Sequence, residues 1–378
     1  MEKTKVPARV AAFDGLRAIA ISAVLITHVD PDNLPGGQLG VDLFFALSGY
    51  LITSLLLKEY DHFGRVSLKD FYIRRILRLA PALMVFAVVV TGIALARNEP
   101  HAWGEFFAVI TYTMNFVAAF KLLGDSMSMG HTWSLAVEEQ FYLLWPLLLI
   151  LLLGRARGWL MGATLALVGA GLLSTFALQV MGVDTWIIYF LPTTRVAPLL
   201  VGAAGAIAHW RGLPSWSARL VASPWIAVTA LGLITAWFFR NTWADAWTWR
   251  AGVAVFAALT VLLIVHAIEA PRSLVTRILS LPPVTWLGRR SYAFYLWHAP
   301  VLWMTAGPTK SPWMHFMATF AMTAAIAELS WRLVEAPALK LKTRFERAGL
   351  PLRAEPSEPH AGALDWPSAK QGSAAQVR

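Results

Sequence analysis

The sequence has 378 residues and no cysteine, and 57% of its residues are hydrophobic whereas only 14% are charged. A typical soluble domain carries roughly 25% charged residues, so this composition excludes an ordinary soluble enzyme, a disordered protein and a disulfide-stapled secreted module. The mean hydropathy of +0.56 indicates one polytopic membrane domain instead. A net charge of +10 suggests nucleic-acid binding at first sight, but the distribution of the charge argues against it.

Eleven apolar stretches follow one another, each close to the roughly 20 residues that a membrane helix needs. They cover residues 14–30, 40–57, 79–96, 103–120, 133–153, 159–181, 191–210, 220–239, 249–268, 286–306 and 312–334. The fourth is the weakest because it contains Glu105 and Asn115. We expect an all-α membrane domain over residues 1–340 and a disordered, basic cytoplasmic tail over residues 341–378.

The orientation in the membrane follows from Lys and Arg in the short loops, which favour the cytoplasmic side. Three lie before residue 10 and six follow the second stretch, whereas residues 30–39 contain none. The basic clusters from Arg155 onward all lie on the cytoplasmic side only if one apolar stretch before Arg155 does not cross the membrane. We therefore expect ten transmembrane helices with both termini cytoplasmic, and a re-entrant, tilted or interfacial segment at residues 103–120. The positive charge then anchors the protein against anionic membrane lipid, and no nucleic-acid partner is expected.

Two polar residues on the first helix form the first candidate pair, since charged or polar groups inside a span are functional candidates by default. Arg17 and His28 are separated by three helical turns, about 16 Å, and so lie on nearly the same face. Arg17 offers a cation near the cytoplasmic end, and His28 offers a proton acceptor near the outer end. For His28 taken alone, an interfacial histidine with a structural role is the simpler interpretation.

Three arginines, Arg74, Arg75 and Arg78, precede the third predicted helix, and the last two share a helical face. Guanidinium groups match phosphate oxygens in geometry and charge. A phosphate-binding element is one interpretation, and simple cytoplasmic anchoring is the other.

A polar stripe marks the helix that begins at the outer side after residue 131, where Ser134, Glu138 and Tyr142 recur at four-residue steps. Asp42 lies at the outer end of its own helix. We expect His28, Asp42, Ser134 and Glu138 to converge in the outer half of the membrane, where a carboxylate would orient the imidazole.

A fourth group, Ser291, Tyr295 and His298, shares one helical face, although packing is the commoner role of aromatic residues in such a position. The nine histidines show no ligand spacing with acids on one face, so no metal site is predicted.

In these motifs the sequence resembles the membrane-bound acyltransferase type 3 family, over about residues 10–340 and in the family's order. The matching segments are Phe13 to Arg17 with His28, Gly40 to Gly49, Phe71 to Pro81, Ser134 to Tyr142, and Ser291 to His298. The resemblance implies a multi-pass enzyme of the bacterial inner membrane. It would move an acyl group, commonly acetyl, from cytoplasmic acyl-CoA to a hydroxyl of a carbohydrate or glycoside acceptor.

The resemblance also implies roles for individual residues. Arg17 and His28 would be the essential pair, Arg75 and Arg78 a donor-binding element and Glu138 an acidic partner, whereas Ser291 to His298 would be only a family marker. From the residues themselves we add Arg17 and Arg74 to the donor-binding candidates and Asp42 to the catalytic candidates. The possible supporting residues are Ser134, Tyr142, Ser291 and His298. Acyl-CoA is expected as a co-substrate, with no permanently bound cofactor. Many family members carry an extracytoplasmic hydrolase-like domain that is not expected here, so either the membrane domain completes the transfer or a separate partner does.

For the mechanism, we expect His28 to take the proton of the acceptor hydroxyl as a general base, oriented by Asp42 or Glu138. A transiently acylated His28 fits the same residues. The alternative function is a transporter or flippase for a lipid-linked or glycosidic substrate, which the lack of an internal repeat disfavours.

Overall fold

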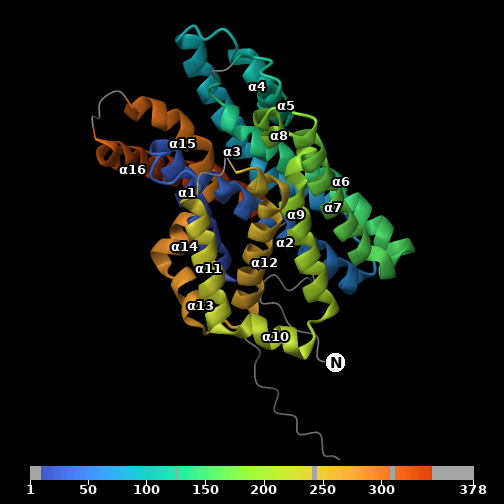
Figure 1. The fold of residues 1–378 in the computed structure, drawn as a ribbon. Helices are drawn as coiled ribbons and strands as arrows, with labels where there is room; N and C mark the ends of the chain where they lie inside the picture. Colours follow the sequence, from blue (N-terminus) through green and yellow to red (C-terminus); the bar gives the residue numbers. More distant parts are fainter. Residues whose placement is uncertain (1–9, 125–126, 241–244, 307–310, 343–378) are drawn as a thin grey trace, which may run out of the picture.

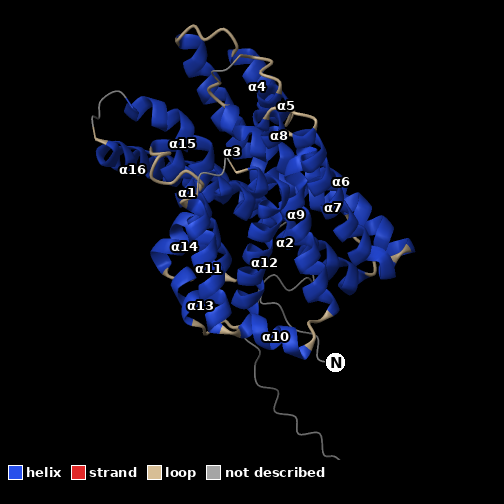
Figure 2. Cartoon of the chain, viewed as in Figure 1, coloured by secondary structure: helices blue, strands red, loops and turns tan. Residues whose placement is uncertain are grey.

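The computed structural model describes residues 10–124, 127–240, 245–306 and 311–342 of the chain, and within them every regular element is a helix (Figure 2). The helices are α1 (Ala11–Val29), α2 (Gly40–Phe63), α3 (Leu68–Ala96), α4 (Ala102–Ile110), α5 (Met114–Ala119), α6 (Trp133–Arg155), α7 (Leu160–Val180), α8 (Thr185–Phe190), α9 (Pro192–Arg211), α10 (Ser215–Ala222), α11 (Pro224–Phe238), α12 (Val253–Glu269), α13 (Leu274–Leu279), α14 (Pro282–Arg289), α15 (Ser291–Ala306), α16 (Pro312–Ser330) and α17 (Ala336–Lys342). Single π-helical turns precede α12 and follow α16.

Six helices of the described residues, α1, α2, α3, α6, α7 and α12, are long and apolar enough to cross a membrane. A seventh span results if α10 and α11, which meet at 63°, count as one. Each expected apolar stretch is mostly helical, with breaks inside 103–120, 220–239 and 286–306, and the total of ten spans and the orientation of the termini stay predictions. The expected tail lies almost wholly outside the described residues, which end at residue 342.

The weakest apolar stretch, residues 103–120, does not form one continuous helix. It is split into α4 and α5, of 9 and 6 residues, each far too short to span a bilayer. Tyr112 in the turn between them has φ 54°, and Gln140 of α6 donates to its carbonyl oxygen at 2.9 Å. The segment is therefore folded back against α6, as expected for a re-entrant or interfacial element.

The two ends of the molecule carry different elements: α10 and α13 lie at one end, and α4, α5 and α8 lie at the other (Figure 1). Arg219 is in α10 and Arg277 is in α13. These basic segments, far apart in sequence, therefore gather at one end, and the side of the membrane on which this end lies stays a prediction.

Helix α2 packs closely against α9 and also contacts α1, α6 and α12. Its crossing with α9 depends on Gly49, because a Cβ atom there would lie 1.9 Å from the Leu199 carbonyl oxygen. The close approach buries the polar residues of α2 inside the helix bundle and brings them within reach of α9.

Helix α3 begins earlier than the hydropathy indicated. The Ser67 side chain caps it by accepting from the Asp70 amide at 3.4 Å, so the helix starts at Leu68. The sequence predicted that the helix would begin after Arg74, Arg75 and Arg78. In the structure these arginines lie inside the first three turns of α3. Their side chains are therefore held at helical spacing.

Candidate functional site

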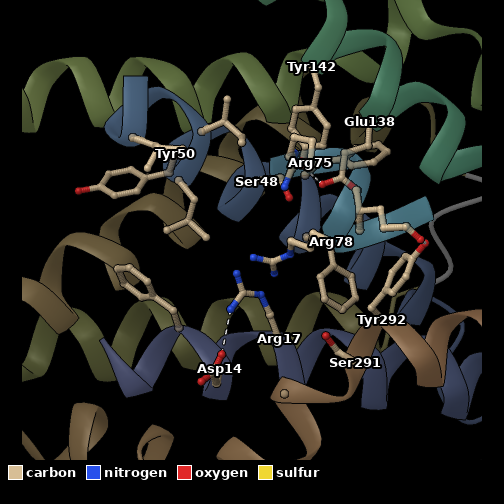
Figure 3. Close-up of a pocket in the computed structure, with 18 of the residues that line it drawn as sticks. Asp14, Arg17, Ser48, Tyr50, Arg75, Arg78, Glu138, Tyr142, Ser291 and Tyr292 are labelled. Carbon is tan, nitrogen blue, oxygen red and sulfur yellow. Dashed lines mark hydrogen bonds and ion pairs between the residues drawn. The ribbon is translucent and has the colours of Figure 1, made fainter. Parts of the chain in front are cut away.

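A cavity of about 710 Å³ lies between α1, α2, α3, α6 and α15 and the turn that follows α16 (Figure 3). Six cationic and three acidic side chains line it. Along α2 the lining extends from Lys58 to Val41, about 26 Å at the helical rise of about 1.5 Å per residue. The cavity therefore runs through most of the length of the bundle and carries an excess of positive charge.

Arg17 enters this cavity from α1 and is held by Asp14, whose Oδ1 lies 2.9 Å from the Arg17 Nη1. The same carboxylate lies 3.6 Å from the Nε of Arg289. The contact depends on a close approach of α14 to α1, because a Cβ atom at Gly288 would lie 1.7 Å from the Asp14 carbonyl oxygen. The Asp14 carboxylate thereby fixes the direction of the Arg17 guanidinium.

Arg78 faces Arg17 across the cavity, and their guanidinium groups lie next to each other in Figure 3. Within the described residues Arg78 makes no hydrogen bond or ion pair, and its side chain is exposed to the cavity. Two cations that face each other with one unneutralised form a site for an anion with several oxygen atoms.

Arg75 lies deeper and packs its Cζ 3.6 Å from the centre of the Tyr142 ring. The Tyr142 hydroxyl in turn donates to the Glu138 carboxylate. Glu138, expected beside His28, instead belongs to the wall of the cavity with Arg75 and Tyr142 (Figure 3).

Arg74 points to a different partner from its two neighbours. It pairs with Glu59 of α2 at 3.1 Å, and both side chains are buried. Glu59 also accepts from the Ser67 amide at 2.8 Å, so this ion pair fixes the beginning of α3 to α2. The ion pair compensates the charge of Arg74. The sequence predicted instead that Arg74 would bind the donor.

Asp42 also differs from expectation. Its Oδ2 lies 2.9 Å from the Nη2 of Arg195 in α9, and both side chains are almost fully buried. Neither Asp42 nor Glu138 contacts His28 in the described part of the chain, so the expected convergence of His28, Asp42, Ser134 and Glu138 does not occur.

His28 lies in the last turn of α1, exposed, with its Nδ1 2.7 Å from the Val24 carbonyl oxygen. A carbonyl oxygen can only accept, so Nδ1 carries the hydrogen and the Nε2 of the neutral ring keeps its lone pair. The His28 ring packs edge to face on His298, with 5.0 Å between centroids, and His298 packs on His131 at 5.2 Å. We call His28, His131 and His298 the histidine cluster.

Two hydroxyl groups separate the cavity from the histidine cluster. The Ser134 and Tyr295 hydroxyl oxygens lie 2.5 Å apart, and both residues line the cavity, as does the buried Ser291. No role is predicted for His131 from the sequence, and for Tyr295 packing is the expected one. His131 lies in the short 3-10 turn that precedes α6, three residues before Ser134, and this nearness in sequence was the available signal for it.

Comparison with known proteins gives a family for this arrangement. The family model described as an acyltransferase domain matches residues 10–332, which include the cavity wall up to α16 and the histidine cluster. The chain belongs to the acyltransferase 3 family. The resemblance inferred from the motifs is thereby confirmed, and the long apolar helices fit a multi-pass membrane protein. No solved structure matches this chain.

The relatives are longer than the region they share with this chain. Peptidoglycan O-acetyltransferase OatA of Listeria monocytogenes is 36% identical over 88% of this chain and 56% of its own length. YrhL of Bacillus subtilis is named provisionally as a peptidoglycan O-acetyltransferase. It is 33% identical over 89% of this chain and 56% of its own length. A Staphylococcus aureus protein named provisionally as an O-acetyltransferase is 34% identical over 86% and 56%. The chain thus spans about half the length of these relatives.

Proposed function

We propose that this protein transfers an acetyl group from cytoplasmic acyl-CoA to a hydroxyl of an envelope carbohydrate or glycoside, in the bacterial inner membrane. The observation that carries the proposal is the cationic cavity, in which Arg78 faces Arg17 and makes no hydrogen bond or ion pair to the residues that the structure describes. Family membership and relatives named for O-acetyl transfer support the reaction type.

The donor phosphates would bind to Arg17 and Arg78, with Arg75 further along the cavity. Arginine suits this role because its guanidinium can form two parallel hydrogen bonds to phosphate oxygens. Arg74 would support the site indirectly, because its ion pair with Glu59 holds α3 in place. The rest of the donor would extend past Glu138 toward Ser134, at the end of the cavity that lies next to the histidine cluster.

The chemical step would use the free Nε2 of His28. The acceptor oxygen attacks the thioester carbonyl carbon while Nε2 takes the hydroxyl proton, and the carbon–sulfur bond breaks. The sulfur leaves as a thiolate, and the proton that His28 took from the hydroxyl passes through water to this sulfur, which restores the neutral base and releases the free thiol of CoA. A positioned general base typically contributes on the order of 10²- to 10⁴-fold in rate. Asp42 and Glu138 would act on this step only through Arg195 and Arg75.

The acceptor class rests on the names of the relatives, two of which refer to peptidoglycan. Because this chain spans about half of their length, we extend that name only to the class of envelope carbohydrates. A separate extracytoplasmic protein would complete the transfer if the membrane domain hands the acetyl group on.

Donor binding can be measured without knowledge of the acceptor. Full-length protein in lipid nanodiscs is titrated with acetyl-CoA by calorimetry, and the same titration is done for Arg78→Ala and Arg277→Ala. Both changes remove one exposed arginine, but only Arg78 lines the cavity. Wild type and Arg277→Ala should bind alike, whereas Arg78→Ala should bind about tenfold to a hundredfold more weakly. Equal affinities in all three proteins would contradict the assigned site.

The product can be identified by mass spectrometry of envelope glycans from cells with and without this protein. A mass difference of one acetyl group supports the proposal. Unacetylated glycans whose side of the membrane changes would instead indicate a flippase.

A further inference from the structure

The cavity stops short of the residue proposed to do the chemistry. Its lining reaches Val41, Ser134 and Tyr295 but includes no member of the histidine cluster. Tyr295 lies directly between, since its ring centroid is 5.5 Å from that of His298 and 5.7 Å from that of His131. A donor in the cavity would therefore meet the Ser134 and Tyr295 hydroxyls before it could reach His28.

Three hydrogen bonds close this passage. The Tyr295 hydroxyl donates to the His131 carbonyl oxygen at 2.6 Å, so the Ser134 hydroxyl must be the donor in the 2.5 Å contact with Tyr295. The Nε2 of His131 donates to the Leu296 carbonyl oxygen at 3.0 Å. The start of α6 and the middle of α15 are thus clamped together through hydroxyl and imidazole groups.

The clamp lies at a weak point of α15. Leu296 would normally accept from the amide of the residue four positions later, but that residue is Pro300, which has no amide hydrogen. This frees the Leu296 carbonyl oxygen for His131. Prolines inside helices are common sites of kinks, and α15 lacks one backbone hydrogen bond between the turn that carries Tyr295 and the turn that begins at Pro300.

On the far side of the clamp the histidine cluster has unused polar atoms. Among the residues that the structure describes, the Nε2 of His298 and the Nδ1 of His131 are buried without a hydrogen-bond partner. His298 is fully buried, and its Nδ1 lies 2.7 Å from the Tyr295 carbonyl oxygen, which fixes its tautomer. Buried polar atoms are nearly always paired, so the cluster is arranged to receive a polar group that enters between its rings.

We propose that Ser134 and Tyr295 form a gate between the donor cavity and the histidine cluster. The inference rests on the proposed acetyl transfer from acyl-CoA. In the closed state the hydroxyl pair keeps the donor thioester away from His28 and from the water that reaches this exposed residue. Opening separates the two hydroxyls by a movement of α15 at Pro300 and lets the thioester meet His28. Such gating protects a reactive donor until an acceptor is in place.

The test is hydrolysis of acetyl-CoA in the absence of acceptor, measured as release of free thiol by full-length protein in nanodiscs. Tyr295→Phe keeps the ring but removes the hydroxyl and both of its hydrogen bonds. The wild-type protein should hydrolyse acetyl-CoA slowly, and Tyr295→Phe about tenfold faster, with acetyl-CoA affinity within twofold of wild type. Ser134→Ala removes one of the two bonds and should give a smaller increase.

Thr305→Val is the matched control. Thr305 lies on the same helix, and its hydroxyl oxygen lies 2.7 Å from that of Thr319 in α16, but Thr305 does not line the cavity. Loss of this hydroxyl should leave the rate of hydrolysis unchanged. A general loosening of α15 would instead raise hydrolysis in Thr305→Val and Tyr295→Phe alike, which would overturn the gate.

The remaining outcomes separate the gate from the reaction on which it rests. If Tyr295→Phe binds acetyl-CoA normally and hydrolyses it at the wild-type rate, the gate is wrong and the proposed function is unaffected. If the wild-type protein does not bind acetyl-CoA, the proposed function is wrong and the gate falls with it. If Tyr295→Phe does not fold, Ser134→Ala decides by the same criterion.

Discussion

Asp42 and Arg195 form a buried ion pair at 2.9 Å that ties α2 to α9. The Arg195 guanidinium is enclosed by four aromatic rings at 4.8–5.9 Å from its Cζ, those of Phe45, Trp133, Tyr189 and Trp249. Such an enclosure excludes water and makes the carboxylate necessary to balance the charge. The ion pair joins α2 to α9, and the contact of Arg195 with Trp133 extends this connection to the start of α6, where Ser134 lies.

Asp42→Asn should destabilise the protein by about 3–5 kcal/mol, because it leaves the Arg195 charge buried without a partner. The measurement is thermal unfolding in nanodiscs. The double variant Asp42→Leu with Arg195→Met, which removes both charges, should recover part of the loss. If Asp42→Asn unfolds like wild type but is inactive, Asp42 takes part in the reaction directly and the structural role is wrong.

His28→Ala should lower acetyl transfer on the order of 10²- to 10⁴-fold while acetyl-CoA affinity stays near that of wild type. The reason is that the Nε2 of His28 is free to take a proton, whereas His28 does not line the donor cavity. Transfer is measured as radiolabel moved from acetyl-CoA into envelope carbohydrate. His62→Ala, which removes an exposed histidine at the end of α2, is the control and should transfer normally. Near wild-type transfer by His28→Ala would refute its assignment as the base.

The double substitution of Arg75 and Arg78 by Ala should abolish measurable acetyl-CoA binding in the micromolar range while the protein still inserts in the membrane. Substitution of both by Lys should restore only part of the affinity, because Lys cannot form the bidentate contact. Calorimetry gives the affinities, and the amount of protein in the membrane fraction reports insertion. Equal affinity of the Lys pair and wild type would mean that these positions serve only to anchor the protein.

The orientation can be tested with single cysteines, since the chain has none. Asp32, which is exposed in the loop after α1, should react from outside in intact cells with a membrane-impermeant thiol reagent. Positions 157 and 277, also exposed, should react only after the membrane is opened. Labelling of either from outside would show that the number of spans before it has the wrong parity.

The sequence by itself determined the parts that depend on local periodicity and length. Apolar stretches of about 20 residues became helices, because a segment that must bury its backbone polar groups in lipid pairs them internally. The alignment of Arg17 with His28 on one face of α1 follows from the 3.6-residue period alone. The weak stretch at residues 103–120 was recognisable from Glu105 and Asn115, and the structure divides it into two short helices.

Only the tertiary structure decided which polar groups meet. Asp42 and Glu138 both lie in the first halves of their helices, α2 and α6, yet Asp42 faces Arg195 whereas Glu138 faces Tyr142 and Arg75. The position of a residue along its helix can be read from the sequence. The neighbour that its side chain faces depends on which helices pack beside it. Ser134 and Tyr295 are 161 residues apart, and their contact exists because the packing of α15 against α1, α3 and α16 brings Tyr295 to the start of α6.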